Sequence, residues 1–414
     1  MPTPPPGPEK LQQAVDAVAE HGSMQAAAAS IGLAPSTLRD RYRKAVERGY
    51  EAGPQIEPEA EQKVRLLEDR CRALEAQVRR QDKEEQLDRW IRNELFNLRS
   101  DPTPPGWVHA PGRMSKSSPG TPFLSLGDWH AGERVNPDEI DGLNEYDLEI
   151  FHRRAKHVVD KAVDLLKHHM VNPVYPGIVV GLLGDMVSGD IHKELQETNE
   201  LATIPTVLDV VGVLRQSLEY LADHCGRVHV VCVVGNHGRN TQKMQAKQRT
   251  ATSFDWLTYK TLELVLNGDS RITFQIPDSA DTHLRIYDHQ YLITHGDQFR
   301  GGDGIIGPLG PLVRGDYKKR LRQSMVDDRY DTLVTGHFHR LITLSQLITN
   351  GSLIGYNEYA FTNNLPYEPP QQAMWITHPE NGITYTLPVR ADAPAKRSGG
   401  DSKWVSVPAG FGEG

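Results

Sequence analysis

Short apolar runs alternate with longer amphipathic stretches in the middle of the chain. The candidate strands span residues 122–127, 177–184, 228–235, 290–296 and 331–337. The stretches 147–170 and 201–224 between them repeat apolar residues at helical spacing. Because the apolar runs are continuous, we expect strands that are covered on both faces, as in an α/β fold.

The pattern changes after residue 340. The segments LITLSQLITN, SLIGYNEYAF, QAMWITH and ITYTLPV contain shorter apolar stretches with polar interruptions. They predict antiparallel strands of a second sheet. The whole of residues 122–390 is therefore predicted to be one large domain with two sheets.

Residues 9–52 predict a separate domain of three short helices. Ser23 is placed to cap the second helix, Gly22 and Gly32 to end the first two, and Pro35 to begin the third. The tight connection before Pro35 resembles the helix-turn-helix of DNA-binding domains. Under this interpretation the third helix is the recognition helix that contacts DNA. The candidate contacts are Ser36, Thr37, Arg39, Arg41 and Arg43. A helical module for oligomerisation or protein docking is the alternative.

Residues 58–100 predict a coiled-coil helix. Apolar residues recur there at intervals of three and four, as Val64, Leu67, Cys71, Leu74 and Val78 show. We expect this segment to join two or more copies of the chain, and a solvated single helix is the alternative. Residues 1–8 are predicted to be a disordered arm, 101–121 a linker rich in Pro, Gly and Ser, and 391–414 a flexible tail.

Composition restricts the location and partners that we expect. The chain has 414 residues, of which 38% are hydrophobic and 24% are charged, and its net charge is -8. No stretch has the roughly 18–20 consecutive apolar residues of a membrane helix, and the N-terminus lacks the apolar core of a secretory signal. Three cysteines without metal-binding spacing fit a reducing compartment. We expect a cytoplasmic protein without a membrane partner, in which nucleic-acid binding depends on local basic patches.

Each of the five candidate strands in the middle of the chain ends in side chains that bind metals. The runs are followed by GDWH, GD, GNHG, HGD and GHFH. The candidate ligands are Asp128, His130, Asp185, Asn236, His295, His337 and His339. Ligands collect at the carboxyl ends of strands in α/β sheets. This set is too large for one ion, but it suits two divalent ions about 3.5 to 4 Å apart. Imidazole together with carboxylate favours Mn, Fe, Zn or Co over Mg.

The order of these five motifs resembles the calcineurin-like metallophosphoesterase superfamily over residues 122–390. The resemblance implies a four-layer αββα sandwich of two mixed sheets. It also implies that Asp128, His130 and His339 hold one ion. Asn236, His295 and His337 would hold the other ion, and Asp185 would bridge the two. His237 would donate a proton to the leaving oxygen of a phosphoester. The alternative is a purely structural His237.

One position departs from the family pattern. The motif usually continues as GNHD or GNHE, whereas this chain has Gly238 after His237. Asp190 and Asp297 are the candidates to replace the missing carboxylate. Asp297 is also placed to orient a ligand imidazole, although capping a turn is an equal alternative.

Among members of the superfamily, the sequence is most similar to phage and prophage DNA repair exonucleases of the SbcD-like type. The blocks GDMVSGDIHKEL and GNHGRN carry this resemblance. It implies a manganese-dependent DNA nuclease, acting as an exonuclease or endonuclease in a bacterial or phage-infected cell. Basic residues near the motifs would neutralise DNA phosphates, with Arg239 nearest the scissile one. The second basic group is Lys318, Lys319, Arg320 and Arg322. A solvated helix face is the alternative for such residues.

The resemblance has a limit, because the chain lacks room after residue 390 for a segment that would dock an ATPase partner. We therefore expect none. Two other functions remain open. One is a phosphoesterase that acts on small nucleotides or phosphoproteins. The other is a non-enzymatic DNA-binding protein with a residual metal site.

Overall fold

The computed structural model describes residues 6–52, 70, 104–109, 120–170, 174–300 and 307–393, and everything below concerns these residues. They belong to two units. The first lies within Met1–Arg89 and the second within Trp90–Gly414. No helix among the described residues is long and apolar enough to cross a membrane.

The first unit is a bundle of three helices, as predicted. They are α1 (Pro8–His21), α2 (Met24–Ser30) and α3 (Pro35–Glu47). Gly22 adopts the left-handed conformation that ends α1, and the Ser23 hydroxyl accepts the N–H of Ala26 at the start of α2. Leu38 packs among small alanines of the other two helices and is fully buried.

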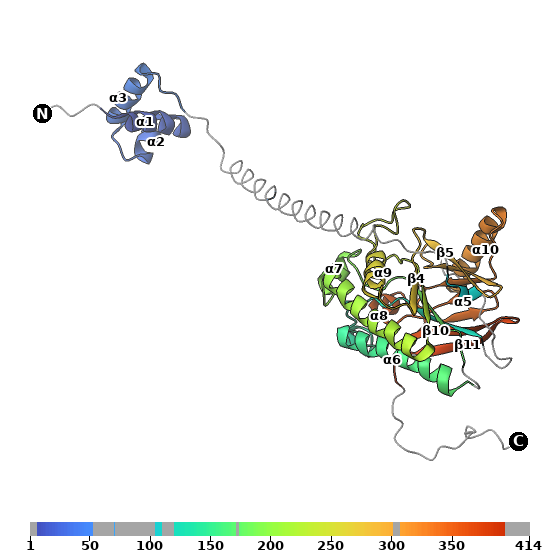
Figure 1. The fold of residues 1–414 in the computed structure, drawn as a ribbon. Coiled ribbons are helices and arrows are strands. Elements are labelled where there is room, and N and C mark those ends of the chain that lie inside the picture. The colour runs from blue at the N-terminus through green and yellow to red at the C-terminus, as the bar shows by residue number, and fades with distance from the viewer. Residues whose placement is uncertain are drawn as a thin grey trace, which may run out of the picture. The chain divides into compact units, whose positions relative to one another are not determined.

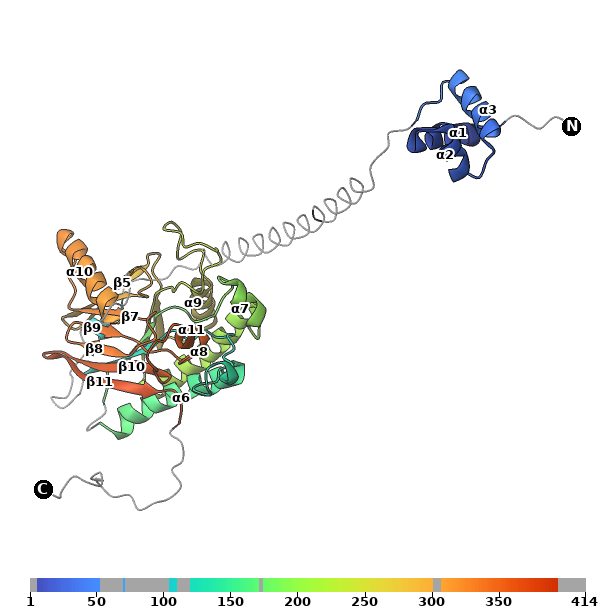
Figure 2. The ribbon, with the colours of Figure 1, turned by 180° about the vertical axis from the view of Figure 1, so that it is seen from behind.

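The second unit contains two sheets (Figures 1 and 2). The first sheet has the strand order β11-β10-β1-β2-β3-β4, in which β1 to β4 are parallel and β10 and β11 are antiparallel additions at the β1 edge. Its strands are β1 (Thr121–Leu126), β2 (Ile178–Leu182), β3 (Val228–Cys232), β4 (Ile272–Gln275), β10 (Gln371–His378) and β11 (Gly382–Arg390).

The second sheet has the order β5-β6-β7-β9-β8 and is also mixed. Strands β6, β7 and β9 are parallel, and β5 and β8 pair antiparallel at its two edges. Its strands are β5 (Asp281–Ile286), β6 (His289–Thr294), β7 (Thr332–Thr335), β8 (Ile342–Leu344) and β9 (Leu347–Thr349).

Helices cover the outer faces of both sheets. The helices α6 (Leu148–His168), α8 (Thr203–Cys225) and α9 (Phe254–Val265) share one apolar core with the first sheet. A second core, which includes Phe123 and Tyr291, lies between the sheets. On the far side, Leu312 of α10 (Leu309–Met325) packs against Leu292 and Leu333 of the second sheet. The layers run helix, sheet, sheet, helix, which confirms the predicted sandwich.

Shorter elements complete the unit. They are α5 (Gly106–His109), the single-turn helix η1 (Pro137–Glu139), α7 (Lys193–Thr198) and α11 (Glu358–Thr362). The last of these corrects a prediction, because SLIGYNEYAF forms no strand. The Asn357 side chain instead accepts the N–H of Ala360, which caps α11.

The predicted division of strands between the sheets was wrong in two places. β6 and β7, which we expected beside the first three strands, belong to the second sheet. β10 and β11, which we expected in the second sheet, extend the first. The local apolar pattern predicts that a segment is a strand, but its partner depends on contacts with distant residues.

The predicted domain boundaries also need correction. Val108, within the predicted linker, is fully buried between the sheets, and its carbonyl accepts the N–H of Tyr287. Ala391 is buried and Asp392 pairs with Arg154, so the second unit continues into the predicted tail. Pro8, assigned to the disordered arm, already begins α1. Residues 1–5 of the arm, 101–103 and 110–119 of the linker, 394–414 of the tail, and the coiled coil apart from Arg70 lie outside the described residues.

Candidate metal centre

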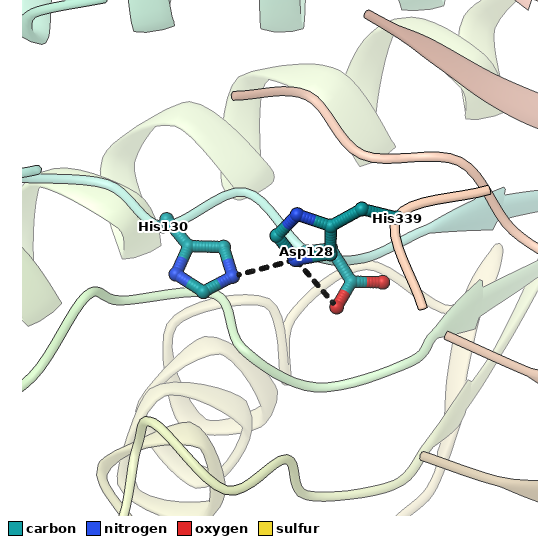
Figure 3. A group of neighbouring side chains, drawn as sticks. All are labelled: Asp128, His130 and His339. Atoms are coloured by element: carbon teal, nitrogen blue, oxygen red, sulfur yellow. Dashed lines mark hydrogen bonds and ion pairs between the residues drawn. The ribbon is translucent and has the colours of Figure 1, made fainter. Parts of the chain in front are cut away.

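The loops after β1, β2, β3, β6 and β7 bring the predicted ligands together. Three overlapping groups have ligand atoms that all lie within 4.8 Å of one another. They are Asp128 with His130 and His339, Asp185 with His295 and His337, and His130 with Asp185 and His237. The first two groups match the two ion sites implied by the sequence, and Figure 3 shows the first of them.

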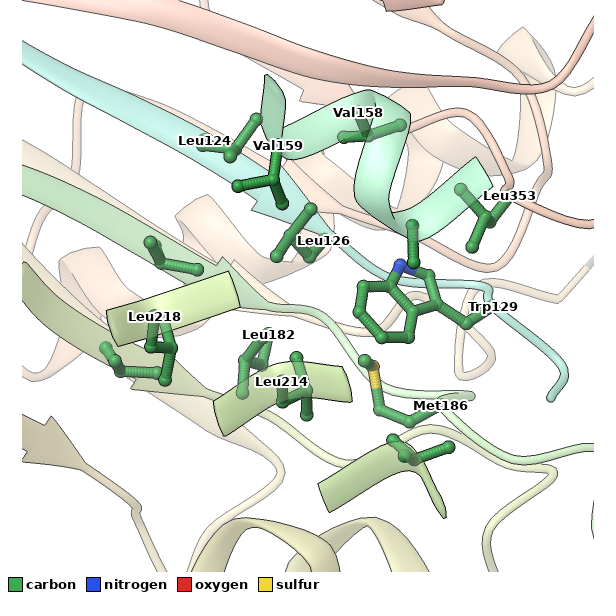
Figure 4. Packing of buried hydrophobic residues seen from close by; sticks show 14 of the residues in the cluster. Leu124, Leu126, Trp129, Val158, Val159, Leu182, Met186, Leu214, Leu218 and Leu353 are labelled. Atoms are coloured by element: carbon green, nitrogen blue, oxygen red, sulfur yellow. The ribbon is translucent and has the colours of Figure 1, made fainter. Parts of the chain in front are cut away.

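Trp129 fixes the direction of the two ligands beside it. Its indole is fully buried against Phe151, with the ring centroids 5.5 Å apart, and Figure 4 shows it in the core beside Met186 and Leu353. The Tyr146 hydroxyl donates to the Trp129 carbonyl at 2.5 Å. With the residue between them anchored in the core, Asp128 and His130 both join the first ligand group.

The candidate ligand atoms within each group lie close to one another. His130 Nε2 lies 3.1 Å from His339 Nε2, which in turn lies 3.6 Å from Asp128 Oδ1. In the second group, His295 Nε2 lies 3.0 Å from Asp185 Oδ2 and 3.2 Å from Asn236 Oδ1. Asn236 therefore lies beside the second group.

The backbone is strained at the ligand positions. Five of the seven predicted ligands have positive φ, an uncommon conformation for residues other than glycine. Their φ values are 50° for Asp128, 47° for His130, 50° for Asp185, 68° for His337 and 51° for His339. Strain that gathers in this way is typical of functional sites, where the surrounding fold holds it in place.

Two glycines make room for the buried carboxylates. A Cβ atom on Gly235 would lie 2.0 Å from Asp185 Oδ1, and one on Gly336 would lie 2.5 Å from Asp128 Oδ2. Any side chain at either position would displace a carboxylate. The glycines beside the motifs are thus required by close approach and not only by turn geometry.

The two carboxylates are buried without an Arg or Lys partner among the described residues. Asp128 is 0% and Asp185 1% exposed. Burial raises the pKa of Asp128 to about 7. Burial also acts to raise the pKa of Asp185, but the adjacent His295 imidazole reverses this and holds it well below its usual value. A cation between these groups would compensate both buried charges.

Two of the predicted ligand imidazoles are held neutral, which is the form that binds a metal. Burial lowers the pKa of His337 to about 4 and that of His339 well below its usual value. Despite burial, Asp185 raises the pKa of His295 to about 10 and Glu133 raises that of His130, so a cation would displace a proton from these two rings. The convergent donors and the buried carboxylates together fit a pair of divalent cations.

His237 lies at the edge of the centre. Its Nδ1 is 3.0 Å from the Ser188 carbonyl, which leaves Nε2 to face outward from that contact. The backbone N–H of His237 donates to Asp185 Oδ1 at 2.6 Å. Neither Asp190, which is exposed, nor Asp297 contacts its ring. The ring's partner is therefore a backbone carbonyl and neither of these two carboxylates.

Asp297 differs from the prediction in a second respect. Its two oxygens accept hydrogen bonds from Arg249 at 2.7 and 2.8 Å, while the Nδ1 of His295 lies 2.8 Å from the Leu183 carbonyl. The carbonyl is thus the group that orients His295. Arg249 is engaged in this partly buried ion pair.

Sequence reasoning missed two buried acidic residues near the centre. Glu133, 7% exposed, has one carboxylate oxygen 3.4 Å from His130 Nδ1 and accepts from Asn357 at 3.1 Å. Asp255, 0% exposed, accepts the backbone N–H groups of Asp185, Met186 and Gly235. The only signal for Asp255 is the start of α9, where Ser253 caps the helix.

Most of the basic residues predicted to bind DNA in the second unit already have partners within the protein. Within α10, Lys319 is buried and pairs with Asp281, which also binds Arg322, while Arg320 pairs with Asp316. These cations have internal partners, and only Lys318 of that group is exposed without a described one. Arg239 donates to three carbonyls of its own loop, those of Asn236, Thr241 and Gln242.

In the first unit, the predicted contacts lie on α3. Ser36, Thr37 and Arg39 are exposed and Arg41 is partly exposed, whereas Arg43 pairs with Asp40 on the same helix. Their part in DNA binding stays a prediction.

Comparison with known proteins adds little to this picture. No family model matches the chain, and no curated protein matches it. Several solved structures are distantly similar. A dimetal phosphatase from Danio rerio has a TM-score of 0.32 at 12% identity, with 66% of this chain and 100% of the other covered.

Two others are equally distant. A Streptococcus pneumoniae protein described as an uncharacterized predicted phosphoesterase has a TM-score of 0.22 at 9% identity, covering 64% of this chain and 97% of the other. A Staphylococcus aureus protein described as a 5′-nucleotidase, in complex with alpha-ketoglutarate, has a TM-score of 0.28 at 11% identity, covering 67% and 56%. Similarity this weak says nothing about what this chain binds or cleaves.

Proposed function

We propose that the second unit is a calcineurin-like metallophosphoesterase that hydrolyses phosphodiester bonds with two divalent cations. The observation that carries this proposal is the convergence of two donor groups around two buried carboxylates. Asp128, His130 and His339 would hold one cation. His295, His337 and Asn236 would hold the other, with Asp185 between them. When bound, the cations would neutralise the phosphodiester and lower the pKa of a water beside it.

His237 supplies the acid in this proposal. Burial lowers its pKa to about 4, so the ring is neutral in the free protein. If the Ser188 carbonyl accepts a hydrogen bond from Nδ1–H, then Nε2 is the atom left to face the substrate. An anionic phosphoester beside Nε2 would raise the pKa of the ring, so that Nε2 takes up a proton from solvent and can then give it to the leaving oxygen.

We further propose that the substrate is DNA and that manganese is the preferred cation. Two lysines support a polyanionic substrate. Lys243 and Lys247 lie in the loop that follows His237, and both are exposed without an ion-pair partner among the described residues. The exposed polar residues of α3 would add a second contact with DNA, and residues 58–100 would join copies of the chain.

Cleavage of three substrates with added manganese tests this proposal. They are end-labelled linear DNA, circular single-stranded DNA and bis-p-nitrophenyl phosphate, each also treated with Asp185→Ala to control for contaminating nucleases. We expect DNA cleavage that the variant lacks, and cleavage of the circle would show endonuclease action. Hydrolysis of the small diester without DNA cleavage would overturn the choice of DNA and favour a small-substrate phosphoesterase. No hydrolysis of any substrate would contradict the enzyme itself.

A further inference from the structure

The carboxylate of Asp255 is the meeting point of two ligand-bearing loops. Its Oδ2 accepts the N–H of Asp185 at 3.0 Å and of Gly235 at 2.8 Å, and its Oδ1 accepts the N–H of Met186 at 3.0 Å. Asp185 is a predicted ligand in the loop after β2, and Gly235 precedes the ligand Asn236 in the loop after β3. One buried side chain therefore fixes the relative position of ligands from two strands.

The backbones of the two loops approach each other closely. A Cβ atom on Gly184 would lie 2.3 Å from the backbone nitrogen of Gly235. The N–H groups at this contact point away from solvent, and a buried N–H without an acceptor is costly. A carboxylate, which accepts with both oxygens and donates nothing, satisfies all three.

The same carboxylate occupies the space beside Gly238. A Cβ atom on Gly238 would lie 2.8 Å from the carboxyl carbon of Asp255 and 2.9 and 3.0 Å from its oxygens. A side chain at position 238 would therefore point into the place that the Asp255 carboxylate fills. The φ of Gly238 is not positive, so the backbone at this position accepts an ordinary residue.

We propose that Asp255 is a positioning residue for the metal centre and supplies the carboxylate that position 238 lacks. The motif GNHG has no acidic fourth residue, and the first turn of α9 provides the acid instead. The inference rests on the proposed metal centre. It assigns to Asp255 no contact with substrate: the residue acts by holding Asp185 and Asn236 at the separation that the cations require.

The role of Asp255 is tested on the full chain by moving the carboxylate from position 255 to position 238. Manganese affinity is measured by calorimetry for the parent, Asp255→Ala, Gly238→Asp and the double variant, with circular dichroism to monitor folding. We expect Asp255→Ala to weaken manganese binding by about 10- to 100-fold, as removal of groups that orient metal ligands does. Gly238→Asp alone should also weaken it, because two carboxylates would compete for one space. The double variant should bind more tightly than either single variant.

Gly268→Asp in the Asp255→Ala background is the matched control. It adds the same side chain where nothing lies within 4 Å, and it should rescue nothing. Asp255→Asn gives a milder test, because its amide would set an N–H against a backbone N–H. If Asp255→Ala does not fold, recovery of folding in the double variant becomes the measurement, and failure of the double variant to fold would overturn the proposal.

The outcomes separate this inference from the proposed function. A parent protein that binds no manganese would contradict the metal centre itself. If the parent binds manganese but Asp255→Ala binds it equally well, or the double variant is no better than Asp255→Ala, only the role of Asp255 is overturned.

Discussion

At the residue scale, the two buried aspartates of the centre adopt a strained backbone conformation, and neighbouring glycines leave space for their carboxylates. Asp128 and Asp185 adopt positive φ although they carry side chains, while Gly336 and Gly235 are needed because those same carboxylates lie against them. Each strained residue costs about 1–3 kcal/mol, which the surrounding packing must offset. The buried Trp129 shows how: its ring is held by the core while its neighbours are presented to the site.

His237→Ala should reduce hydrolysis at least about 100-fold without loss of bound metal, because the residue is proposed to transfer a proton and not to bind a cation. Turnover and metal content are measured on the same sample. His192→Ala is the control, since that exposed ring lies with its centroid 6.0 Å from the His237 ring and should matter little. Loss of a cation in His237→Ala would show instead that the third donor group, which contains His237, binds metal.

The fully buried His229 makes stability depend on pH. Its ring contacts Thr273 and Gln275, and burial lowers its pKa to about 4, below the 6.5 of an unperturbed histidine. The lowered pKa means that the unfolded chain binds the proton more tightly. The neutral ring therefore contributes full stability above pH 6.5, and this contribution is lost as the pH falls toward 4.

The contribution amounts to about 3 kcal/mol between pH 7 and pH 4. Urea unfolding of the parent and His229→Gln across this range measures it. The variant should lose less stability on acidification than the parent. Equal losses in the two proteins would exclude a neutral His229 as the cause.

The residues that the sequence predicted and those that it missed differ in a physical way. Asp128, His295 and the other ligands stand directly after apolar runs, where strand ends of an α/β fold are visible in the pattern. Glu133 contacts the ring of the ligand His130, and Asp255 accepts hydrogen bonds from backbone N–H groups that are distant along the chain. No local pattern marks such contacts, so only the fold reveals them.

At the scale of elements, the basic segments serve different purposes. The basic side chains of α10 form internal ion pairs, such as Lys319 with Asp281, although the sequence of the helix predicts a basic surface patch. Its buried face includes Lys319 and Gln323, while Val313 and Tyr317 are exposed. The sequence of the helix alone could not show that its polar residues are buried and its apolar residues exposed, because Asp281, the partner of Lys319, lies on another element. The loop after His237 keeps its lysines exposed.

Replacing Lys243 and Lys247 together by Gln should weaken DNA binding and reduce its salt dependence. The slope of log affinity against log salt concentration should become shallower by about one unit for each phosphate that is no longer neutralised. Hydrolysis of the small diester should not change, because neither lysine reaches the ligands in the proposal. Lys167→Gln, an exposed change on α6, is the control. An unchanged slope in the double variant would remove this loop from the DNA interface.

At the scale of the whole molecule, the chain joins a small helical unit to a large unit that carries the candidate chemistry. Each unit has its own apolar core among the described residues. If the proposed function holds, we therefore expect that binding of DNA and hydrolysis can be impaired separately. The sequence predicted both units from helix caps and strand ends, but not which sheet each strand joins, because that depends on pairing between distant segments.

Arg39→Ala combined with Arg41→Ala tests this separation. The two changes on α3 should weaken DNA binding about tenfold or more, because fewer DNA phosphates would be neutralised, and leave hydrolysis of the small diester intact. Lys10→Ala on α1 serves as the control. Parental DNA affinity in the double variant would favour the alternative in which the first unit docks proteins or joins copies of the chain.

The most direct test of the central claim is the number of metal ions that the purified chain retains after loading with manganese and removal of the excess. The donor groups of Asp128 and of Asp185 predict two ions per chain in the parent, and fewer in Asp185→Ala. A parent that retains none, or an Asp185→Ala variant that retains as many as the parent, would contradict a dinuclear centre at these strand ends.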